Sequence, residues 1–585
     1  AIYIGILKGW IPWLLDAPHQ LFEILGPGLV LGPMLLGKTL FIAFSSVIEG
    51  RPFYPSELGD ADREWWARWS GWGLLSALTW MFSGAFVFLG PLLLKTVAAK
   101  VAAAVTAGGL GGLVSLIGKS VGTPAANQAG GAKAESPWRG VVLALGAPLF
   151  CLATLLLVSV GTQALFRVLP KGWTGSVGEA PEPFRGYTIF VLAAVAVLFA
   201  FGVLMGKFVN VNRFSLQGTY RNRLVRAYLG ASNKQRRPNL FTGFDIHDNL
   251  RLHALRGNRP LPLINMALNL VAGEDLAWQQ RKAENFTATP LHCGSSRLGY
   301  RRTQGYGGQR GISLGTAVAT SGAAANPNMG SNSSAAITFI MTLFNARLGI
   351  WLGNPGPLGR NTWTRGGPVN SASLILDEAL GFTNASHPYV NLSDGGHFEN
   401  LALYEMVRRR CRFIVVGDAG SDPSYAYNDL GNAIRKIRID FGISIDFADR
   451  INIFPKDLKK TNPAARYCAV GRIRYRDADG PNVPDGILIY IKPAICETES
   501  YDVYNYARSS LTFPHESTAN QWFSESQFES YRALGREAIL TMVRNGPHPH
   551  QTVPLSFQQF QEDVEDYITN GPVVKTAGVV VPGKV

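Results

Sequence analysis

Long apolar stretches dominate the first 208 residues of the chain. Four of them approach or exceed the roughly 20 apolar residues that a helix needs to cross a hydrocarbon layer of about 30 Å. They are residues 22–48, 71–94, 141–166 and 187–206, and the last two contain no charged side chain. Weaker candidates lie at 1–15 and 97–118. The pattern predicts four to six membrane-spanning helices.

After residue 208 the apolar runs become short and alternate with helical patterns. They are 263–272, 334–352, 373–380, 389–394, 399–410, 411–420 and 486–495. In 399–410, Leu403, Met406 and Val407 share one helical face. The run FIVVG that follows predicts a strand buried on both faces of a parallel sheet.

This order of elements predicts a multi-pass α-helical membrane region followed by an α/β domain. Strand, acidic turn, helix and strand in succession are typical of an α/β sheet. We place the membrane region at 1–208, the α/β domain at 209–470, and a C-terminal extension with a loose tail at 471–585.

Charge then indicates an orientation. Only 16% of residues are charged, yet the formal net charge is +14. Residues 208–260 hold ten Lys and Arg against two Asp, a local net charge of +8. Next to a predicted span, this excess predicts the cytoplasmic side. No nucleic-acid recognition motif accompanies it, so no nucleic-acid partner is expected.

The five cysteines are scattered and form no CxxC pair, which indicates a reducing compartment without a cysteine-based metal site. We expect no metal and no cofactor. The opening has neither an initiating Met nor a basic segment typical of a signal peptide, so we interpret the chain as a fragment or a processed product.

The clearest chemical candidate is Asp394 in NLSDGGHFEN, residues 391–400. It follows an apolar run, and reactive groups of open α/β sheets gather beyond the carboxyl ends of the strands. Gly395 and Gly396 allow a second group to approach closely. Two interpretations stay open: Asp394 caps the helix that begins near Phe398, or it activates a hydroxyl nucleophile.

The block NLSDGGHFENLALYEMVRRRCRFIVVGDAG, with ATSGAAANPNMG (319–330) upstream, resembles the patatin-like phospholipases. Further blocks are similar to a bacterial group in which a membrane segment interrupts that fold. They are 212–232, 239–245, 275–286 and 343–355. The resemblance extends over approximately residues 20–460, and the blocks occur in the family's order.

The resemblance implies a lipid acyl hydrolase with a Ser–Asp dyad in which Asp394 is the carboxylate. It also implies membrane lipids as partners and a bacterial inner-membrane location, with the α/β domain on the cytoplasmic side. The family's GGGxR oxyanion loop and serine elbow have no clear match here. In the interrupted group both precede the membrane segment, so we expect that N-terminal part outside this sequence, where it or other membrane subunits would be partners.

Two serines compete as nucleophile within the chain. Ser313, in GISLG, fits the letters of GxSxG but lacks the preceding strand that an elbow needs. Ser321, followed by Gly322, has small neighbours, although the resemblance gives its block a supporting role. We therefore favour a nucleophile outside the chain and keep Ser321 as the internal candidate.

Other polar residues carry weaker predictions. His397 and Glu399 beside Asp394 lack a third ligand at metal-binding spacing. Asp418, at the end of a predicted strand, could line the same cleft. The alternative to an enzyme is a non-catalytic scaffold or accessory subunit of a larger membrane complex, motivated by the missing oxyanion loop and nucleophile.

Overall fold

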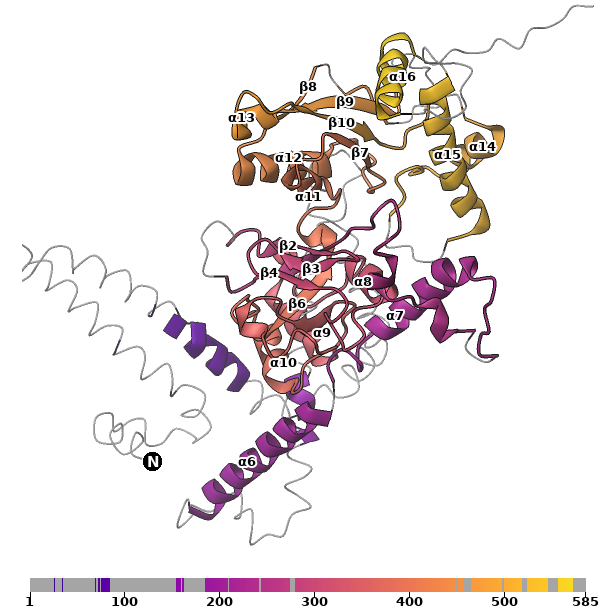
Figure 1. The fold of residues 1–585 in the computed structure, drawn as a ribbon. Helices are drawn as coiled ribbons and strands as arrows, with labels where there is room; N and C mark the ends of the chain where they lie inside the picture. The colour runs from indigo at the N-terminus through magenta and orange to yellow at the C-terminus, as the bar shows by residue number, and fades with distance from the viewer. Residues whose placement is uncertain are drawn as a thin grey trace, which may run out of the picture. The chain divides into compact units, whose positions relative to one another are not determined.

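The computed structural model describes the second half of the chain almost continuously (Figure 1). The described residues are 26, 34, 69, 72–73, 75–84, 154–158, 160–161, 185–208, 210–240, 243–273, 279–448, 451–455, 465–496, 499–517, 523–544 and 556–571. The chain divides into two compact units, one formed by 1–114 and 135–199 and the other by 115–134 and 200–585. The second unit carries both described sheets.

Within the described residues, helices and strands have the following bounds. The α-helices are α6 (Arg185–Phe208), α7 (Gln217–Leu224), α8 (Leu314–Ser321), α9 (Ala335–Leu343), α10 (Ala372–Ala379), α11 (Leu403–Arg408), α12 (Asn428–Phe441), α13 (Tyr475–Asp479), α14 (Tyr501–Ser509), α15 (Glu525–Arg544) and α16 (Phe557–Asn570). The strands are β1 (Ile264–Asn269), β2 (Ala283–Ala288), β3 (His292–Ser295), β4 (Gly299–Arg302), β5 (Ile350–Gly353), β6 (Tyr389–Asp394), β7 (Phe413–Gly417), β8 (Ile445–Phe447), β9 (Cys468–Ile473) and β10 (Gly486–Ile491). Short helical turns include η3 (Val225–Leu229), η4 (Gly230–Ser232), η5 (Ile246–Asp248), η6 (Leu252–Leu255), η8 (Gly330–Asn332), η9 (Pro357–Gly359) and η10 (Gly395–His397).

The first sheet has six strands in the order β4-β3-β2-β1-β6-β5, and every neighbouring pair is antiparallel. Side chains alternate between the two faces of a strand. On β6, Val390 and Leu392 therefore enter one apolar core, whereas Asn391 and Ser393 project to the other side, where they form polar contacts. Helix α8 packs against β1 and β6. The carboxyl end of β6 thus lies in the interior of the sheet, opposite Met266 of β1.

The second sheet has the order β7-β10-β9-β8. Strands β7 and β10 are parallel, and the other pairs are antiparallel. Leu488, Val416 and Ile437 belong to its core, which also includes Ala267 and Ala283 of the first sheet. The two sheets therefore share one continuous apolar cluster. Strand β9 runs through the predicted boundary at residue 470.

The prediction of a multi-pass helical membrane region is wrong for the part of the chain that the structure describes. There, no helix is both long enough and apolar enough to span a bilayer. The predicted spans at 1–15 and 97–118 lie outside the described residues, as do most of 22–48 and 141–166 and half of 71–94. The predicted inner-membrane location depended on these spans, so the same finding contradicts it.

The C-terminal end of α6, which covers the predicted span 187–206, contacts protein, whereas Val195, Leu198 and Phe199 further back in the helix are exposed. The carbonyl oxygen of Gly206 accepts a hydrogen bond from the backbone N–H of Ser371, at 2.8 Å. A Cβ atom on Gly206 would stand 2.4 Å from Oδ1 of Asn370. This end of the helix packs against protein, and an apolar composition alone does not reveal what a helix packs against.

The prediction for FIVVG is confirmed in part, because β7 pairs in parallel with β10, but the predicted burial of both its faces is wrong. The segment FIVVG does form strand β7, but β6 and β7 belong to different sheets. Strand β7 lies at a sheet edge, where Ile414 and Val416 are buried while Phe413 and Val415 are exposed. Apolar residues on both faces of this strand therefore do not indicate burial of both faces. The predicted tail at 571–585 lies outside the described residues except for Gly571.

Candidate functional site

Asp394 occupies the end of β6 and is partly buried. Its Oδ1 atom accepts a hydrogen bond from the backbone N–H of Gly396 at 2.7 Å, so the side chain caps the short turn η10. Its Oδ2 atom forms no hydrogen bond within the described part of the chain. One oxygen thus orders the turn, and the other can accept a proton. The capping and the chemical interpretations of this residue are compatible.

Burial changes the proton affinity of this carboxyl group. Removal from water raises the pKa of Asp394 to about 6, and the hydrogen bond from Gly396 only partly opposes the shift. Above about pH 6 the group is a carboxylate with a proton affinity well above that of an exposed aspartate. This is the property that a general base at near-neutral pH requires.

Tyr220 and the C-terminal end of α8 lie near Asp394. The hydroxyl oxygen of Tyr220 is 2.9 Å from the position that a Cβ atom would take on Gly322. Burial raises the pKa of Tyr220, and the charge of Asp394 raises it further. Tyr220 therefore contacts the segment that follows Ser321 and is close enough to Asp394 to be affected by its charge, and the absence of a side chain on Gly322 makes room for it.

Ser321 is the last residue of α8 and is partly buried. Its hydroxyl forms no hydrogen bond within the described residues, so none joins it to Asp394. The structure brings the two predicted segments together but does not join the two side chains.

His397 provides a second link between the same segments. Its Nε2 atom lies 3.3 Å from the carbonyl oxygen of Ala324, and its Nδ1 atom lies 2.8 Å from Oγ of Ser393. A carbonyl oxygen only accepts, so Nε2 carries the proton and Nδ1 accepts from the serine hydroxyl. Burial lowers the pKa of His397 to about 4, so the imidazole is neutral at pH 7. With the proton on Nε2, His397 links Ser393 to Ala324 and so orders the turn.

The glycines after Asp394 are required by close contacts. A Cβ atom on Gly395 would stand 3.0 Å from the carbonyl oxygen of Asn265. One on Gly396 would stand 2.5 Å from Oδ1 of Asn400 and 3.1 Å from Oδ1 of Asp394. The two residues let the turn lie against β1 and receive the aspartate side chain.

The remaining predicted residues lie elsewhere or have structural contacts. Ser313 caps α8 by accepting a hydrogen bond from the backbone N–H of Thr316 at 3.1 Å. Glu399 accepts hydrogen bonds from the backbone N–H groups of Leu401 and Tyr404. Asp418 is buried after β7, in the second sheet, and pairs with Lys492 at 3.0 Å. No hydrogen bond or ion pair links Asp418 to Asp394.

In the described residues no group of His, Cys, Asp and Glu side chains is arranged to hold a metal ion. Two contributors to the site were not predicted, Tyr220 and Ser393. Tyr220 lies far from Asp394 in sequence, and only the tertiary fold brings them together. Ser393 could have been suspected from its position, since it faces away from Val390 and Leu392 in an alternating strand.

Comparison with known proteins does not identify the chain. No protein-family model matches it, and no curated protein is similar to it.

Proposed function

We propose that Asp394 is the proton acceptor of a serine-type carboxylic-ester hydrolase that acts on the acyl esters of lipids. The single observation that supports this most is the state of its carboxyl group. It is partly buried at a strand end, its pKa is raised to about 6, and Oδ2 is unoccupied by any described donor.

In this mechanism the carboxylate accepts the hydroxyl proton of a serine while the serine oxygen attacks the ester carbonyl. The protonated Asp394 returns this proton to the oxygen of the leaving alcohol as the ester C–O bond breaks, and an acyl-serine ester remains. Water then attacks that ester while Asp394 accepts a proton from the water, and the proton passes to the serine oxygen as the carboxylic acid leaves. The bond to Gly396 keeps the carboxylate oriented throughout. The lipid class of substrate follows from the resemblance of the DGG block, and the pKa supports the base role.

The attacking serine is the second part of the proposal. Ser321 is the candidate within the chain, because the segment that follows it contacts Tyr220 and also contacts His397 of the DGG turn. A serine outside this chain is the other source, since the chain has no clear elbow of its own. A fluorophosphonate probe distinguishes the two by the residue that it labels.

The test compares Asp394→Asn with the wild type in the full-length protein, using nitrophenyl esters of short and long acyl chains. We expect kcat/KM to fall by about 10²- to 10⁴-fold, the usual contribution of a general base. The wild-type rate should fall below about pH 6, where the carboxylate becomes protonated. The control is Asp477→Asn, which removes an exposed carboxylate on α13.

A second candidate is a non-catalytic scaffold, and one observation favours it. Asp394 already caps η10, and no hydrogen bond joins it to Ser321. If the full-length protein hydrolyses no ester and no serine reacts with the probe, the scaffold role replaces the enzymatic one. If Asp394→Asn retains full activity, the enzyme does not use this carboxylate.

A further inference from the structure

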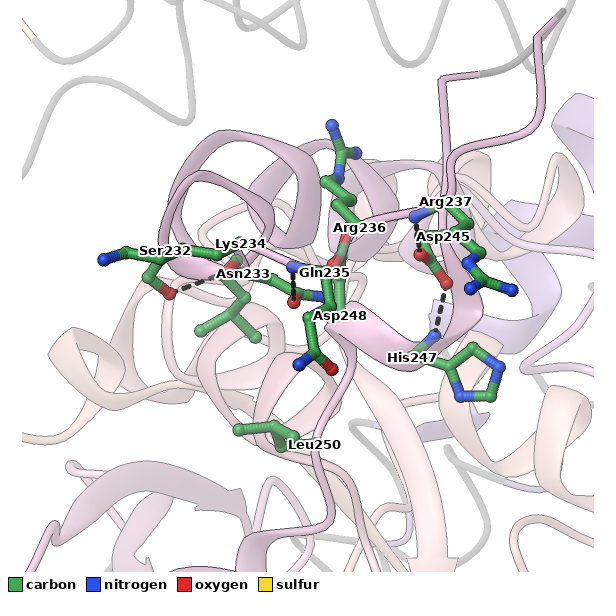
Figure 2. A pocket seen from close by; sticks show the side chains of 11 residues that line it. Ser232, Asn233, Lys234, Gln235, Arg236, Arg237, Asp245, His247, Asp248 and Leu250 are labelled. Atoms are coloured by element: carbon green, nitrogen blue, oxygen red, sulfur yellow. Dashed lines mark hydrogen bonds and ion pairs between the residues drawn. The ribbon is translucent and has the colours of Figure 1, made fainter.

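A pocket of about 1140 Å³ lies in the segment between α7 and β1 (Figure 2). Leu229 and Leu250 are the apolar residues of its lining, and the other lining residues are polar or charged. Most are between Ser232 and Asp248, which belong to a single stretch of chain. This volume lies slightly above the usual range of about 300–1,000 Å³ for small-molecule sites. The Asp394 site does not contribute to the lining.

One acidic residue of the lining, Asp245, accepts its hydrogen bonds from backbone N–H groups. Asp245 accepts hydrogen bonds from the backbone N–H of Arg237 at 2.6 Å and from that of His247 at 2.9 Å. These bonds lower the pKa of Asp245. Its carboxylate stays ionised and holds two parts of the pocket wall together.

The other acidic residue, Asp248, accepts its hydrogen bonds from side chains. Asp248 accepts from Nε of Arg236 at 2.6 Å and from Nδ2 of Asn233 at 2.9 Å. Arg236 also donates to the carbonyl oxygen of Gly243 at 2.6 Å. A Cβ atom on Gly230 would stand 2.8 Å from Oδ2 of Asp248, so the ion pair lies directly against the backbone of η4. The pocket wall is thus ordered without a ligand.

Two cationic side chains of the lining remain without an acidic partner. Neither Lys234 nor Arg237 forms an ion pair through its side chain among the described residues, and both residues are exposed. In Figure 2 Lys234 extends at the end of the pocket near Ser232, whereas Arg237 and His247 lie together at the other end. Asp245 and Asp248 are also the only acids in the sequence between 208 and 260, against ten Lys and Arg. The lining itself carries three cations, Lys234, Arg236 and Arg237, against two acids, a net charge of +1 that favours an anion.

We propose that this pocket binds a small phosphorylated compound, with its phosphate group held at one of the two cationic ends, by Arg237 or by Lys234. Guanidinium and ammonium groups are the side chains that bind phosphate oxygens most strongly, through charge-assisted hydrogen bonds. Amide and hydroxyl groups of the lining supply further polar contacts, and the two leucines accommodate an apolar part. The phosphate can belong to a lipid headgroup or to a free phosphorylated metabolite. The proposal does not depend on ester hydrolysis at Asp394.

The experiment measures binding to the full chain by thermal shift and by vesicle sedimentation. The probes are inorganic phosphate, glycerol 3-phosphate, and phosphatidylcholine vesicles with and without phosphatidic acid. The variant is Lys234→Ala/Arg237→Ala, which keeps the backbone N–H of Arg237 that bonds to Asp245. The control is Arg360→Ala/Arg365→Ala, which removes the same charge from exposed positions outside the pocket.

We expect the wild type and the control to bind a phosphate probe, and the pocket variant to bind at least about tenfold more weakly with an unchanged melting temperature in the absence of probe. Binding of the soluble probes indicates a free metabolite, and binding of the acidic vesicles alone indicates a headgroup. Equal binding by the pocket variant and the control overturns the proposal, as does the absence of binding by the wild type to every probe.

Discussion

Asp394 and His397 are three residues apart. Burial shifts the pKa of each in the direction that favours the neutral form. The pKa of Asp394 is raised from 3.8 to about 6, and that of His397 is lowered from 6.5 to about 4. Between pH 4 and 6 the folded protein holds a proton on Asp394 that the unfolded chain has lost. Over nearly the same range it lacks a proton on His397 that the unfolded chain has bound. The two groups therefore contribute opposite slopes to the pH dependence of stability.

The first prediction follows from this opposition. Asp394 lowers the free energy of unfolding as pH rises from 4 to 6, because there the folded state binds more protons than the unfolded state. Asp394→Asn removes that slope and leaves the opposite slope of His397. The unfolding free energy of the variant minus that of the wild type should grow by about 1–2 kcal/mol from pH 4 to 6.5, since one pKa unit is worth 1.36 kcal/mol and the group is partly hydrated.

Urea unfolding at pH steps from 4 to 7.5 measures this difference directly. Titration of all other groups cancels between the two proteins, provided that they do not contact Asp394. The exposed-site variant Asp477→Asn should show no such growth. A difference that stays constant or shrinks with pH would mean that the Asp394 carboxyl has an ordinary pKa.

At the scale of elements, one face of strand β6 packs in an apolar core, and the other face carries a network of hydrogen-bonded polar side chains. On its polar side Asn391 accepts from Asn269 at 2.7 Å and donates to Oε1 of Glu378 at 3.0 Å. Glu378, on α10, forms an ion pair with Arg347, and both side chains are fully buried. Burial raises the pKa of Glu378, and the charge of Arg347 opposes that shift. This network fixes α10 against the strand that ends in Asp394.

The second prediction concerns this network. Arg347→Met leaves Glu378 buried without a cation, which should lower the free energy of unfolding by about 3–5 kcal/mol in urea denaturation. Arg347→Met/Glu378→Leu replaces both charges by apolar groups of similar volume and should recover most of the loss. Arg360→Met, at an exposed position, should change stability by less than about 0.5 kcal/mol. If the double variant is as unstable as the single one, desolvation of the unpaired acid is not the cause.

The sequence allowed strand β6 and the position of Asp394 at its end to be predicted, because a short apolar run bounded by DGG is a local signal. The partners of β6 could not be predicted. Antiparallel pairing with β1 and β5 depends on contacts between distant segments. For the same reason the apolar run of β7 predicted a central strand, although it lies at an edge of another sheet. Tyr220 comes near Asp394, and Arg347 pairs with Glu378, only through such long-range contacts.

At the scale of the whole molecule, the two sheets of the second unit depend on a common core. Ala267 of β1 and Ala283 of β2 belong to the same cluster as Leu488 and Tyr490 of β10. A second cluster of buried charged side chains lies at the carboxyl ends of β7 and β10. There Lys492 contacts Asp418 at 3.0 Å and Asp422 at 3.5 Å. Tyr490 also donates a hydrogen bond to Asp418.

The third prediction is that this distant ion pair supports the Asp394 site. Lys492→Met leaves Asp418 buried without its cation, at a cost of about 3–5 kcal/mol. Because the apolar cluster is continuous, we expect this loss to destabilise both sheets as one cooperative unit. Amide hydrogen exchange should therefore accelerate in β6 by the same free energy as in β10, while Lys234→Met, at an exposed position, should leave both unchanged. Faster exchange confined to β10 would show that the sheets open independently, and the geometry of Asp394 would then depend on the first sheet alone.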